Sequence, residues 1–334
     1  MAQETYLSRH LVSSEDWPDG QVEEVLKLAK DMKEGQEPSW AADILNNKAV
    51  FLLFNKASTR SRISFHAGVA ELGGVPLTLN PEDQKLHPGE PWKELSETLV
   101  ATGGAICVRL LPTSDVAYGK TEELLREMAL ISGDNGPPVV SMSHGRWHPC
   151  QGLYEMMTYM DALGGNVEGK RILIAWTKGD KAAPESPTQD TLAMTTRMGM
   201  KVTLCHPPGY ELDPEVLKIA EKHADANPSG SFVLSDDLGI ASQGQDIVYA
   251  RHWGPPVQRG TFSRDRYSDW YCDERILGAA RFIHPMPVSR GVEASADVVD
   301  GDRSLLKELI KNKHYLQKAV LALLVRMRAG ADAV

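Results

Sequence analysis

Short apolar runs alternate with amphipathic stretches along the whole 334-residue chain. The runs AVFLLF at 49–54 and RILIAW at 171–176 are continuous, which is typical of strands buried on both faces of a parallel sheet. The stretches between such runs carry apolar residues at helical spacing. The predicted strands are residues 49–54, 105–111, 138–142, 171–176, 201–205, 232–234 and 246–250. The predicted helices are residues 22–32, 63–72, 92–101, 121–131, 188–198, 214–223 and about 304–327.

The alternation of strands and helices restarts after about residue 165. This division predicts an α/β protein with two doubly wound parallel-sheet domains. We expect a first domain at residues 1–150 and a second at 151–303, joined by a helix that spans the boundary. The final helix, about 304–330, is expected to pack back on the first domain. Because such sheets bind ligands at the carboxyl ends of their strands, the loops after strands are where functional side chains are expected.

Composition and charge exclude several classes of protein. The net charge of −9 and the lack of a Lys/Arg cluster exclude sequence-independent nucleic-acid binding. No apolar run is long enough to cross a bilayer, and residues 1–17 lack the apolar core of a signal peptide, so we expect no membrane association and a cytoplasmic location. Cys107, Cys150, Cys205 and Cys272 form no CxxC pair, which indicates reduced thiols rather than a zinc site.

The loop after the first predicted strand carries candidate chemistry. It reads Ser58-Thr59-Arg60-Ser61-Arg62 and leads into a helix that Ser58 can cap. Backbone N–H groups at a helix start, together with hydroxyl and guanidinium groups, form a site for phosphate. A capped helix with solvated arginines explains the same residues equally well, so both interpretations stay open at this point.

Three further elements follow predicted strands or lie near the C-terminus. Arg109 ends the apolar run AICVR, His148-Pro149-Cys150-Gln151 follows the strand at 138–142, and His284-Pro285-Met286-Pro287 lies later in the chain. Each is weak alone, because a strand-end arginine can form an ion pair, a lone histidine is more often structural, and HPxP is typical of turns.

Together and in this order, the four elements resemble the aspartate and ornithine transcarbamylase superfamily. The loop is similar to that family's S-T-R-T-R-x-S-F element, with Ser61 where Thr is usual and His66 where many members have Glu. HPCQ is similar to H-P-x-Q, and HPMP to H-x-L-P. The resemblance covers nearly the whole chain and implies a carbamoyltransferase that uses carbamoyl phosphate without a metal or an organic cofactor.

The resemblance also implies roles for individual residues. Thr59, Arg60, Arg109 and His148 take the catalytic roles, in which they stabilise the oxyanion and the departing phosphate. Lys313 stands where the family has a late-helix arginine, so the charge is kept and the bidentate fork is lost. The implied carbamoyl phosphate ligands are Ser58, Thr59, Arg60, Ser61, Arg109, His148, Gln151, His284, Pro285, Met286 and Lys313.

The acceptor residues depart from the ornithine enzymes. Those enzymes carry an acid two residues after a late-strand Tyr, where this chain has Arg251, and they carry a Ser-Met-Gly that this chain lacks. A cation repels an α-ammonium and attracts a carboxylate, so an N-acetylornithine-like acceptor is favoured over free ornithine. The expected acceptor ligands are Arg146, Trp176, Glu185, Arg251, Trp92 and His87. Core packing is the alternative for Trp176.

Other segments are similar to the N-acetylornithine transcarbamylase branch and to a related, poorly characterised branch. They include Trp176-Thr177, the proline-containing loop through residues 184–187, and Asp269-Trp270. Members of these branches thread this loop into a knot, so the resemblance allows a trefoil knot in the second domain. It also links the chain to amino-acid metabolism, and to arginine biosynthesis.

The resemblance further implies a homotrimer with active sites shared between subunits. The loop with Gln84, Lys85 and His87 is the candidate for reaching a neighbouring subunit, and a solvated surface loop is the alternative. A second hypothesis is a catalytically inactive homologue that binds carbamoyl phosphate as a structural or regulatory partner. Arg60 and His148 argue against it, whereas Lys313 and the altered acceptor loop leave it open.

Overall fold

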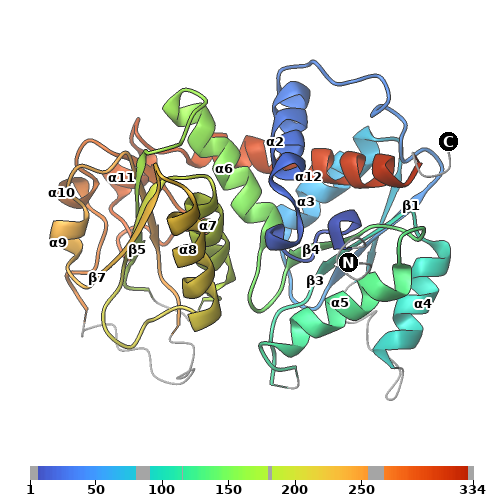
Figure 1. Cartoon of the computed structure of the whole chain (residues 1–334), viewed down its shortest axis with the longest axis horizontal. Helices are drawn as coiled ribbons and strands as arrows, with labels where there is room; N and C mark the ends of the chain where they lie inside the picture. Colours follow the sequence, from blue (N-terminus) through green and yellow to red (C-terminus); the bar gives the residue numbers. More distant parts are fainter. Residues whose placement is uncertain (1–6, 80–90, 115, 180–182, 255–266, 330–334) are drawn as a thin grey trace. The chain divides into compact units, whose positions relative to one another are not determined.

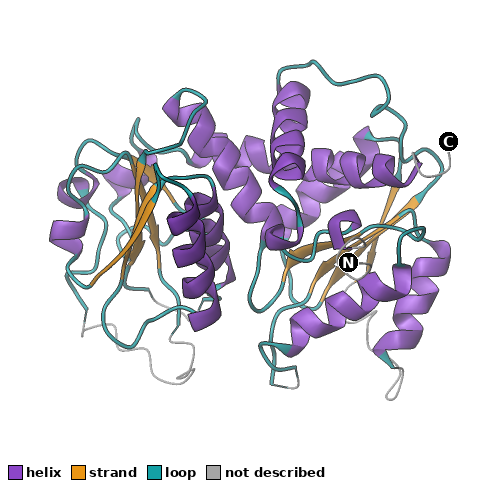
Figure 2. Cartoon of the chain, viewed as in Figure 1, coloured by secondary structure: helices purple, strands orange, loops and turns teal. Residues whose placement is uncertain are grey.

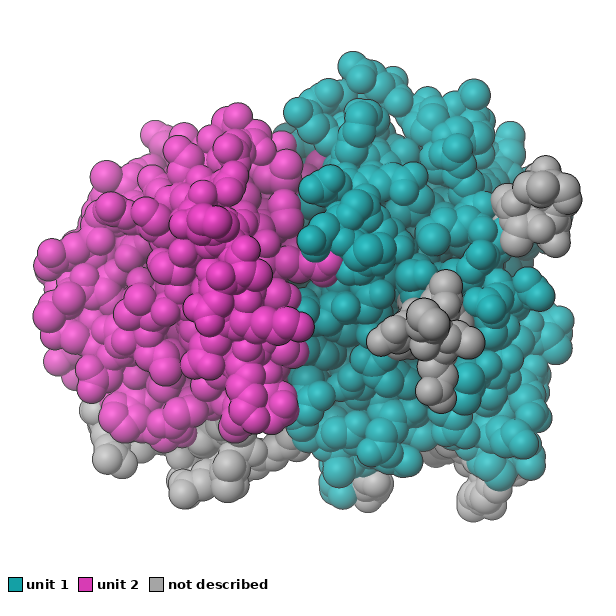
Figure 3. All heavy atoms as spheres, in the orientation of Figure 1, with its two compact units in different colours: residues 1–154, 311–334 teal, residues 155–310 magenta. Residues whose placement is uncertain are grey.

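The computed structural model describes residues 7–79, 91–114, 116–179, 183–254 and 267–329. The chain forms two compact units: residues 1–154 with 311–334 are unit 1, and residues 155–310 are unit 2 (Figure 3). The domain boundaries predicted from the sequence, at residues 150 and 303, and the predicted end of the final helix near residue 330 remain predictions. Along the chain, one unit passes into the other within α6 (Pro149–Leu163) and again within α12 (Leu306–Ala329).

Unit 1 is built on four parallel strands in the order β2-β1-β3-β4. Helices cover both faces of the sheet, with α4 and α5 on one side and α3 and α12 on the other (Figure 1). The strands are β1 (Ala49–Phe54), β2 (Val75–Leu79), β3 (Ala105–Arg109) and β4 (Val139–Ser143). The remaining elements are η1 (Leu7–Arg9), η2 (Ser14–Asp16), α2 (Asp19–Lys33), α3 (Thr59–Glu71), α4 (Trp92–Thr102) and α5 (Lys120–Ser132).

Unit 2 has five parallel strands in the order β7-β6-β5-β8-β9. Here α7 and α8 lie on one side of the strands and α9 and α10 on the other (Figure 2). The strands are β5 (Arg171–Trp176), β6 (Lys201–Cys205), β7 (Ser231–Ser235), β8 (Ile247–Arg251) and β9 (Arg281–Ile283). The helices are α7 (Ser186–Arg197), α8 (Pro214–Ala226), α9 (Leu238–Ala241), α10 (Glu274–Leu277) and α11 (Ala296–Asp300).

These sheets confirm the predicted fold class, two doubly wound α/β domains. The apolar runs become the central strands because they are buried on both faces, as Val50, Leu52, Leu53 and Phe54 of β1 show with at most 1% exposure. The strand order reverses between β1 and β3 in unit 1 and between β5 and β8 in unit 2. Open α/β sheets bind ligands at these positions, beyond the carboxyl ends of the strands.

The sequence patterns do not predict β2 or β9. Both are edge strands, and β2 contains Pro76, which cannot donate to a ladder and weakens the strand signal. β9 has three residues, too few to show a period. The predicted knot stays a prediction, since residues 180–182 and 255–266 lie outside the described ranges. Among the helices that those ranges contain, none combines the length and the apolar character that a membrane span requires.

Candidate functional site

Loops of unit 1 meet at the carboxyl edge of its sheet, because the strands are parallel. Phe54 at the end of β1 pairs with Arg109 at the end of β3, which pairs with Ser143 at the end of β4. Asn55 joins the first two loops, since Nδ2 donates to the Leu111 carbonyl at 2.7 Å and Oδ1 accepts from the Leu111 N–H at 2.9 Å. The predicted phosphate loop and Arg109 therefore follow neighbouring strands at the edge where such sheets bind ligands.

The predicted phosphate loop forms the first turn of α3, which begins at Thr59. Ser58 occupies the N-cap position in an extended conformation, but its side chain makes no capping hydrogen bond, so the predicted side-chain cap is absent. The first N–H groups of a helix have no acceptor within the helix, and the helix dipole makes them attractive to anions. Thr59 and Arg60 are exposed and Ser61 is buried. The turn can thus offer backbone and side-chain donors to a phosphate.

Arg109 is a largely buried cation at the end of β3. Its Nε is buried and has no hydrogen-bond partner among the described residues. Burial lowers the pKa of the guanidinium, the nearby Tyr154 opposes that effect only in part, and no carboxylate of the described residues is among the causes. The simple ion pair that would explain this arginine structurally is therefore not seen in those ranges. Because a buried charge without a partner is costly, the position is suited to an anionic ligand.

His148 precedes α6 and follows the turn at residues 144–147. The side chains of His148 and Gln151 are buried, with 6% and 2% exposure. Burial, followed by the positive charges of Lys313 and Arg109, holds the pKa of His148 well below its usual range. The imidazole is therefore neutral at neutral pH. In that form it can donate one hydrogen bond to a carbonyl oxygen without carrying a charge of its own.

The last helix contributes Lys313 to this part of unit 1. Its Nζ lies 3.3 Å from the Ser61 hydroxyl and 4.8 Å from the centre of the Tyr154 ring. One turn further along α12, Gln317 accepts a hydrogen bond from the Ser64 hydroxyl. The end of the chain thus holds the helix that starts with the predicted phosphate loop, and it places a cation beside that loop.

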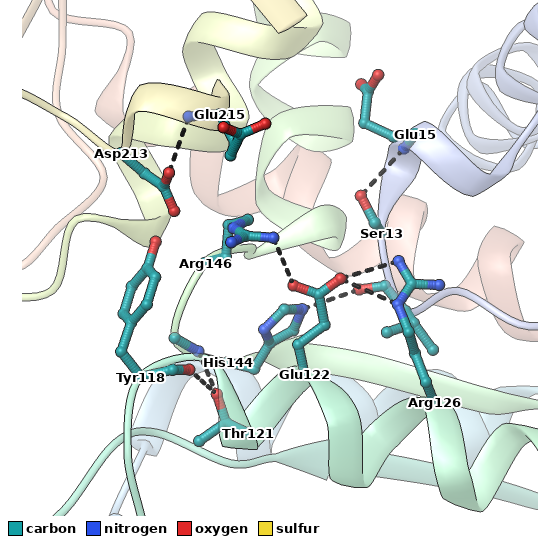
Figure 4. A network of polar contacts seen from close by, with 12 residues as sticks. Ser13, Glu15, Tyr118, Thr121, Glu122, Arg126, His144, Arg146, Asp213 and Glu215 are labelled. Carbon is teal, nitrogen blue, oxygen red and sulfur yellow. Dashed lines mark hydrogen bonds and ion pairs between the residues drawn. The ribbon is translucent and has the colours of Figure 1, made fainter. Parts of the chain in front are cut away.

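Arg146, predicted to contact the acceptor, lies in a chain of charges within unit 1. Its Nη1 is 3.2 Å from Glu122, and Glu122 also pairs with Arg126 at 2.9 Å (Figure 4). Arg126 in turn lies 3.1 Å from Asp16. This network ties the turn before His148 to α5 and to the N-terminal segment. An acceptor would have to compete with Glu122 for Arg146.

Trp92, another predicted acceptor ligand, packs against the apolar core of unit 1. Its indole Nε1 donates to the Leu124 carbonyl at 2.8 Å, which satisfies the polar end of the ring. These contacts explain Trp92 as a structural residue. Gln84, Lys85 and His87 lie outside the described residues.

In unit 2, Arg251 occupies the position that corresponds to Arg109 in unit 1. It ends β8 and pairs in register with Trp176 at the end of β5, beside the reversal of strand order. Arg251 is 6% exposed, and its Nε has no hydrogen-bond partner within the described ranges. A second buried cation with an unsatisfied donor therefore stands at a ligand-binding edge.

Trp176 and Glu185 are both buried. Trp176 is 1% exposed, its Nε1 donates to the Trp253 carbonyl at 2.9 Å, and its ring centre lies 4.5 Å from that of Tyr210. This geometry favours the core-packing interpretation of Trp176. Glu185 is 8% exposed and stands at the N-cap position of α7 without a side-chain cap.

The predicted amide-binding turn follows β9. His284 is fully buried and Pro285 is buried beside it. The Met286 N–H donates to His284 Nδ1 at 2.8 Å, so the imidazole proton is on Nε2, which donates to Glu293 at 2.8 Å. Sequence analysis misses Glu293, because an acid in a loop nine residues after a histidine matches no motif and its burial is visible only in the structure.

Within the described ranges, no three His, Cys, Asp or Glu side chains are grouped as they would be around a metal ion.

Two family models match the chain. The carbamoyl phosphate-binding domain of aspartate/ornithine carbamoyltransferase matches residues 9–161, and the Asp/Orn-binding domain matches residues 172–324. The chain belongs to the aspartate/ornithine carbamoyltransferase family.

Relatives of this carbamoyltransferase are similar over nearly their whole length. The ornithine carbamoyltransferase of Methanothermobacter thermautotrophicus is 31% identical, covering 94% of this chain and 97% of the relative. The ornithine carbamoyltransferase of Carboxydothermus hydrogenoformans is 29% identical, and the match covers 96% of this chain and 99% of the relative. A structure of acetylornithine transcarbamylase complexed with acetylcitrulline has a TM-score of 0.85 at 28% identity, covering 94% and 98%. A mutant of N-acetyl-L-ornithine transcarbamylase with carbamyl phosphate and N-succinyl-L-norvaline has the same score and identity. The predicted enzyme class is confirmed.

Buried neutral histidines predict a loss of stability in mild acid. Burial lowers the pKa of His10 to about 3 and those of His144 and His284 to about 4, and it lowers that of His148 as well. In the unfolded chain these groups take up protons from about pH 6.5 downward. Stability should therefore fall between about pH 6.5 and 4, by up to about 1.4 kcal/mol per pH unit for each histidine. Urea unfolding across this range measures the slope.

His10→Asn is the matched variant for this test, because an asparagine oxygen can replace Nδ1 as acceptor for the Val139 N–H, which lies 3.0 Å away. The variant should show a shallower pH dependence by about one proton. An unchanged slope would show that His10 does not titrate in this range on unfolding.

Proposed function

We propose that this carbamoyltransferase transfers the carbamoyl group of carbamoyl phosphate to the amine of a small carboxylate-bearing amino compound and releases phosphate. We further propose an acceptor that resembles N-acetylornithine rather than free ornithine. The enzyme would act in the cytoplasm, in amino-acid metabolism and specifically in arginine biosynthesis.

The observation that carries this proposal is Arg109 and its surroundings in unit 1. A guanidinium with a buried Nε and no carboxylate partner among the described residues ends β3, next to a strand that leads into an uncapped helix start. The charges of Arg109 and Lys313 are close enough to lower the pKa of His148. Two cations, backbone N–H groups and a neutral imidazole are a suitable set for an acyl phosphate such as carbamoyl phosphate.

In the proposed reaction, the phosphate binds to the first turn of α3 and to Arg109. An uncharged amine attacks the carbonyl carbon, forms the new C–N bond, and the C–O bond to phosphate then breaks. Thr59, Arg109 and His148 donate to the carbonyl oxygen as its negative charge grows. Arg60 stabilises the departing phosphate. The amine proton leaves with solvent or phosphate, and holding the two reactants together lowers the barrier by about 7–11 kcal/mol at best.

Arg251 supports the acceptor assignment. A buried cation binds a carboxylate strongly and opposes an α-ammonium, since charges interact more strongly in a low-dielectric interior. N-acetylornithine carries a carboxylate and a masked α-amine, so it suits this position better than ornithine. Solved structures of N-acetylornithine transcarbamylases are similar to this chain at a TM-score of 0.85, whereas the sequence relatives are named ornithine carbamoyltransferases at similar identity. The charge of Arg251 therefore indicates the acceptor better than the names of the relatives do.

A panel of amines tests the acceptor. Purified protein is incubated with carbamoyl phosphate and, separately, with ornithine, N-acetylornithine, N-succinylornithine, aspartate, putrescine, lysine or β-alanine, and phosphate release is measured. An N-acylated ornithine should give the highest kcat/KM. Faster turnover of free ornithine would reject the acceptor part of the proposal and leave the transfer reaction in place.

We also propose a homotrimer. Apolar side chains are exposed on unit 1, with Val75 and Leu77 of the edge strand β2 at 53% and 42% exposure and Ile63 of α3 at 63%. Exposed apolar groups on an edge strand are typical of a protein-binding surface. Light scattering coupled to size exclusion should give the mass of three chains. A monomer with full activity would reject the trimer and the sharing of sites between subunits.

A further inference from the structure

Glu293 is a fully buried carboxylate in the loop between β9 and α11. Its Oε1 accepts two hydrogen bonds from imidazoles, at 2.5 Å from His252 Nδ1 and at 2.8 Å from His284 Nε2. Its Oε2 accepts from the Ser289 N–H at 2.8 Å. Burial alone would raise the pKa of Glu293, but the hydrogen bonds from the two histidines outweigh it and hold that pKa well below its usual range.

Through these contacts Glu293 joins segments that follow different strands of unit 2. His252 comes directly after β8, and His284 directly after β9. The His252 ring also packs against Gly179 in the loop after β5, where an added Cβ would lie 2.3 Å from the ring. The backbone carbonyl of Glu293 accepts from the Cys272 N–H at 3.1 Å. One carboxylate thus organises the carboxyl edge at which Arg251 stands.

A chain of hydrogen bonds leads from Glu293 to the backbone of the turn at residues 284–287. The carboxylate keeps the His284 proton on Nε2, which leaves Nδ1 free of a proton to accept the Met286 N–H at 2.8 Å. Met286 has a positive φ of 55°, a conformation that is unfavourable for a residue with a side chain and persists only where its surroundings hold it. His284 supplies that hold, and Glu293 fixes His284.

We propose that Glu293 is a positioning residue for carbamoyl transfer: it fixes the tautomer and orientation of His284 and so shapes the backbone of the turn that binds the carbamoyl amide. This inference rests on the proposed function of that turn. Glu293 does not touch the substrate, so its loss acts mainly on the binding of carbamoyl phosphate. A neutral amide at position 293 accepts more weakly from the two imidazoles than a carboxylate does, because charge-assisted hydrogen bonds are about twice as strong. It also brings an NH2 group toward the Ser289 N–H.

The test compares Glu293→Gln with Glu155→Gln. Glu155 is the matched control, because it is also fully buried in unit 2 and accepts from the Thr191 hydroxyl of α7. Both variants keep the side-chain volume and replace a buried carboxyl group by an amide. Glu293→Gln should raise the KM for carbamoyl phosphate about tenfold, with a smaller fall in kcat, a change that matches one charge-assisted hydrogen bond. Glu155→Gln should keep KM within about twofold of the wild type.

Proton NMR of the imidazole N–H groups gives a readout that needs no turnover. The His252 and His284 N–H signals should lie far downfield in the wild type and in Glu155→Gln, and should move upfield in Glu293→Gln. If Glu293→Gln does not fold, His252→Leu replaces it, since it removes one donor to the carboxylate and should raise KM in the same direction.

The outcomes separate the two proposals. A wild-type protein without carbamoyl transfer rejects the proposed function, and the NMR signals then decide whether Glu293 holds the imidazoles. An active wild type whose Glu293→Gln variant keeps the wild-type KM overturns the positioning role alone. Equal effects of both substitutions on KM overturn it as well, because they would reflect a general loss of structure.

Discussion

Replacing Arg60 by alanine is expected to abolish carbamoyl transfer and to leave the fold intact. Arg60 is exposed on the first turn of α3, beside the uncapped backbone N–H groups that we assign to phosphate. Its guanidinium is proposed to stabilise the charge of the departing phosphate, and loss of one such donor lowers kcat by about 10²–10³-fold. Stability should stay within about 0.5 kcal/mol of the wild type, because the side chain is on the surface.

The matched control is Lys48→Ala. Lys48 is an exposed cation directly before β1, at the opposite end of the strand that leads to Arg60. It should keep wild-type kcat and KM. Steady-state kinetics and thermal unfolding of both variants make the comparison. Normal turnover by Arg60→Ala would remove the phosphate assignment of this loop, and unfolding of the variant would show that Arg60 has a structural role.

Replacing Arg109 by methionine should have opposite effects on activity and on stability. Transfer should fall by about 10²–10³-fold or more, because the guanidinium is assigned to both the phosphate and the carbonyl oxygen. Stability should rise by about 1 kcal/mol, because an apolar side chain of similar length removes a largely buried cation that has no carboxylate partner in the described ranges. Such opposite effects are expected at a site that binds an anion.

Arg126→Met is the contrasting variant. Arg126 pairs with Asp16 and Glu122, whose side chains are only 10% and 13% exposed, so its removal leaves two poorly solvated carboxylates. This variant should be less stable by at least about 1 kcal/mol. Chemical unfolding of the two variants shows directly whether each substitution raises or lowers the free energy of unfolding. Destabilisation of similar size in both would mean that Arg109 has a structural partner and is not held for a ligand.

The sequence predicts the central strands and the positions of Arg109 and Arg251 because these features depend on local pattern. Continuous apolar runs identify buried parallel strands, and a charge at the end of such a run falls at the carboxyl edge. Edge strands are harder to predict, because β2 contains a proline and β9 is short. The burial pattern of an edge strand is set by what covers it, which the sequence of the strand does not record.

The pairing of polar side chains could not be predicted, since it depends on contacts between residues far apart in the chain. Arg146 was predicted to bind the acceptor, but its Nη1 lies 3.2 Å from the Glu122 carboxylate on α5. Trp92 and Trp176 carry indole N–H groups that bond to backbone carbonyls of other elements, which favours packing roles. Glu293 is visible only when β8 and β9 are side by side and bring His252 and His284 to the same carboxylate.

The most direct test of the central claim is transfer of the carbamoyl group itself. Purified protein is incubated with isotopically labelled carbamoyl phosphate and N-acetylornithine, and the amine is analysed by mass spectrometry, with Arg60→Ala as control. The amine should gain one labelled carbamoyl group in the presence of the wild-type protein and none in the presence of the variant. Absence of any labelled product from this amine and from the rest of the panel, while carbamoyl phosphate still protects the protein from heat, would contradict the proposed transfer and support a binding protein.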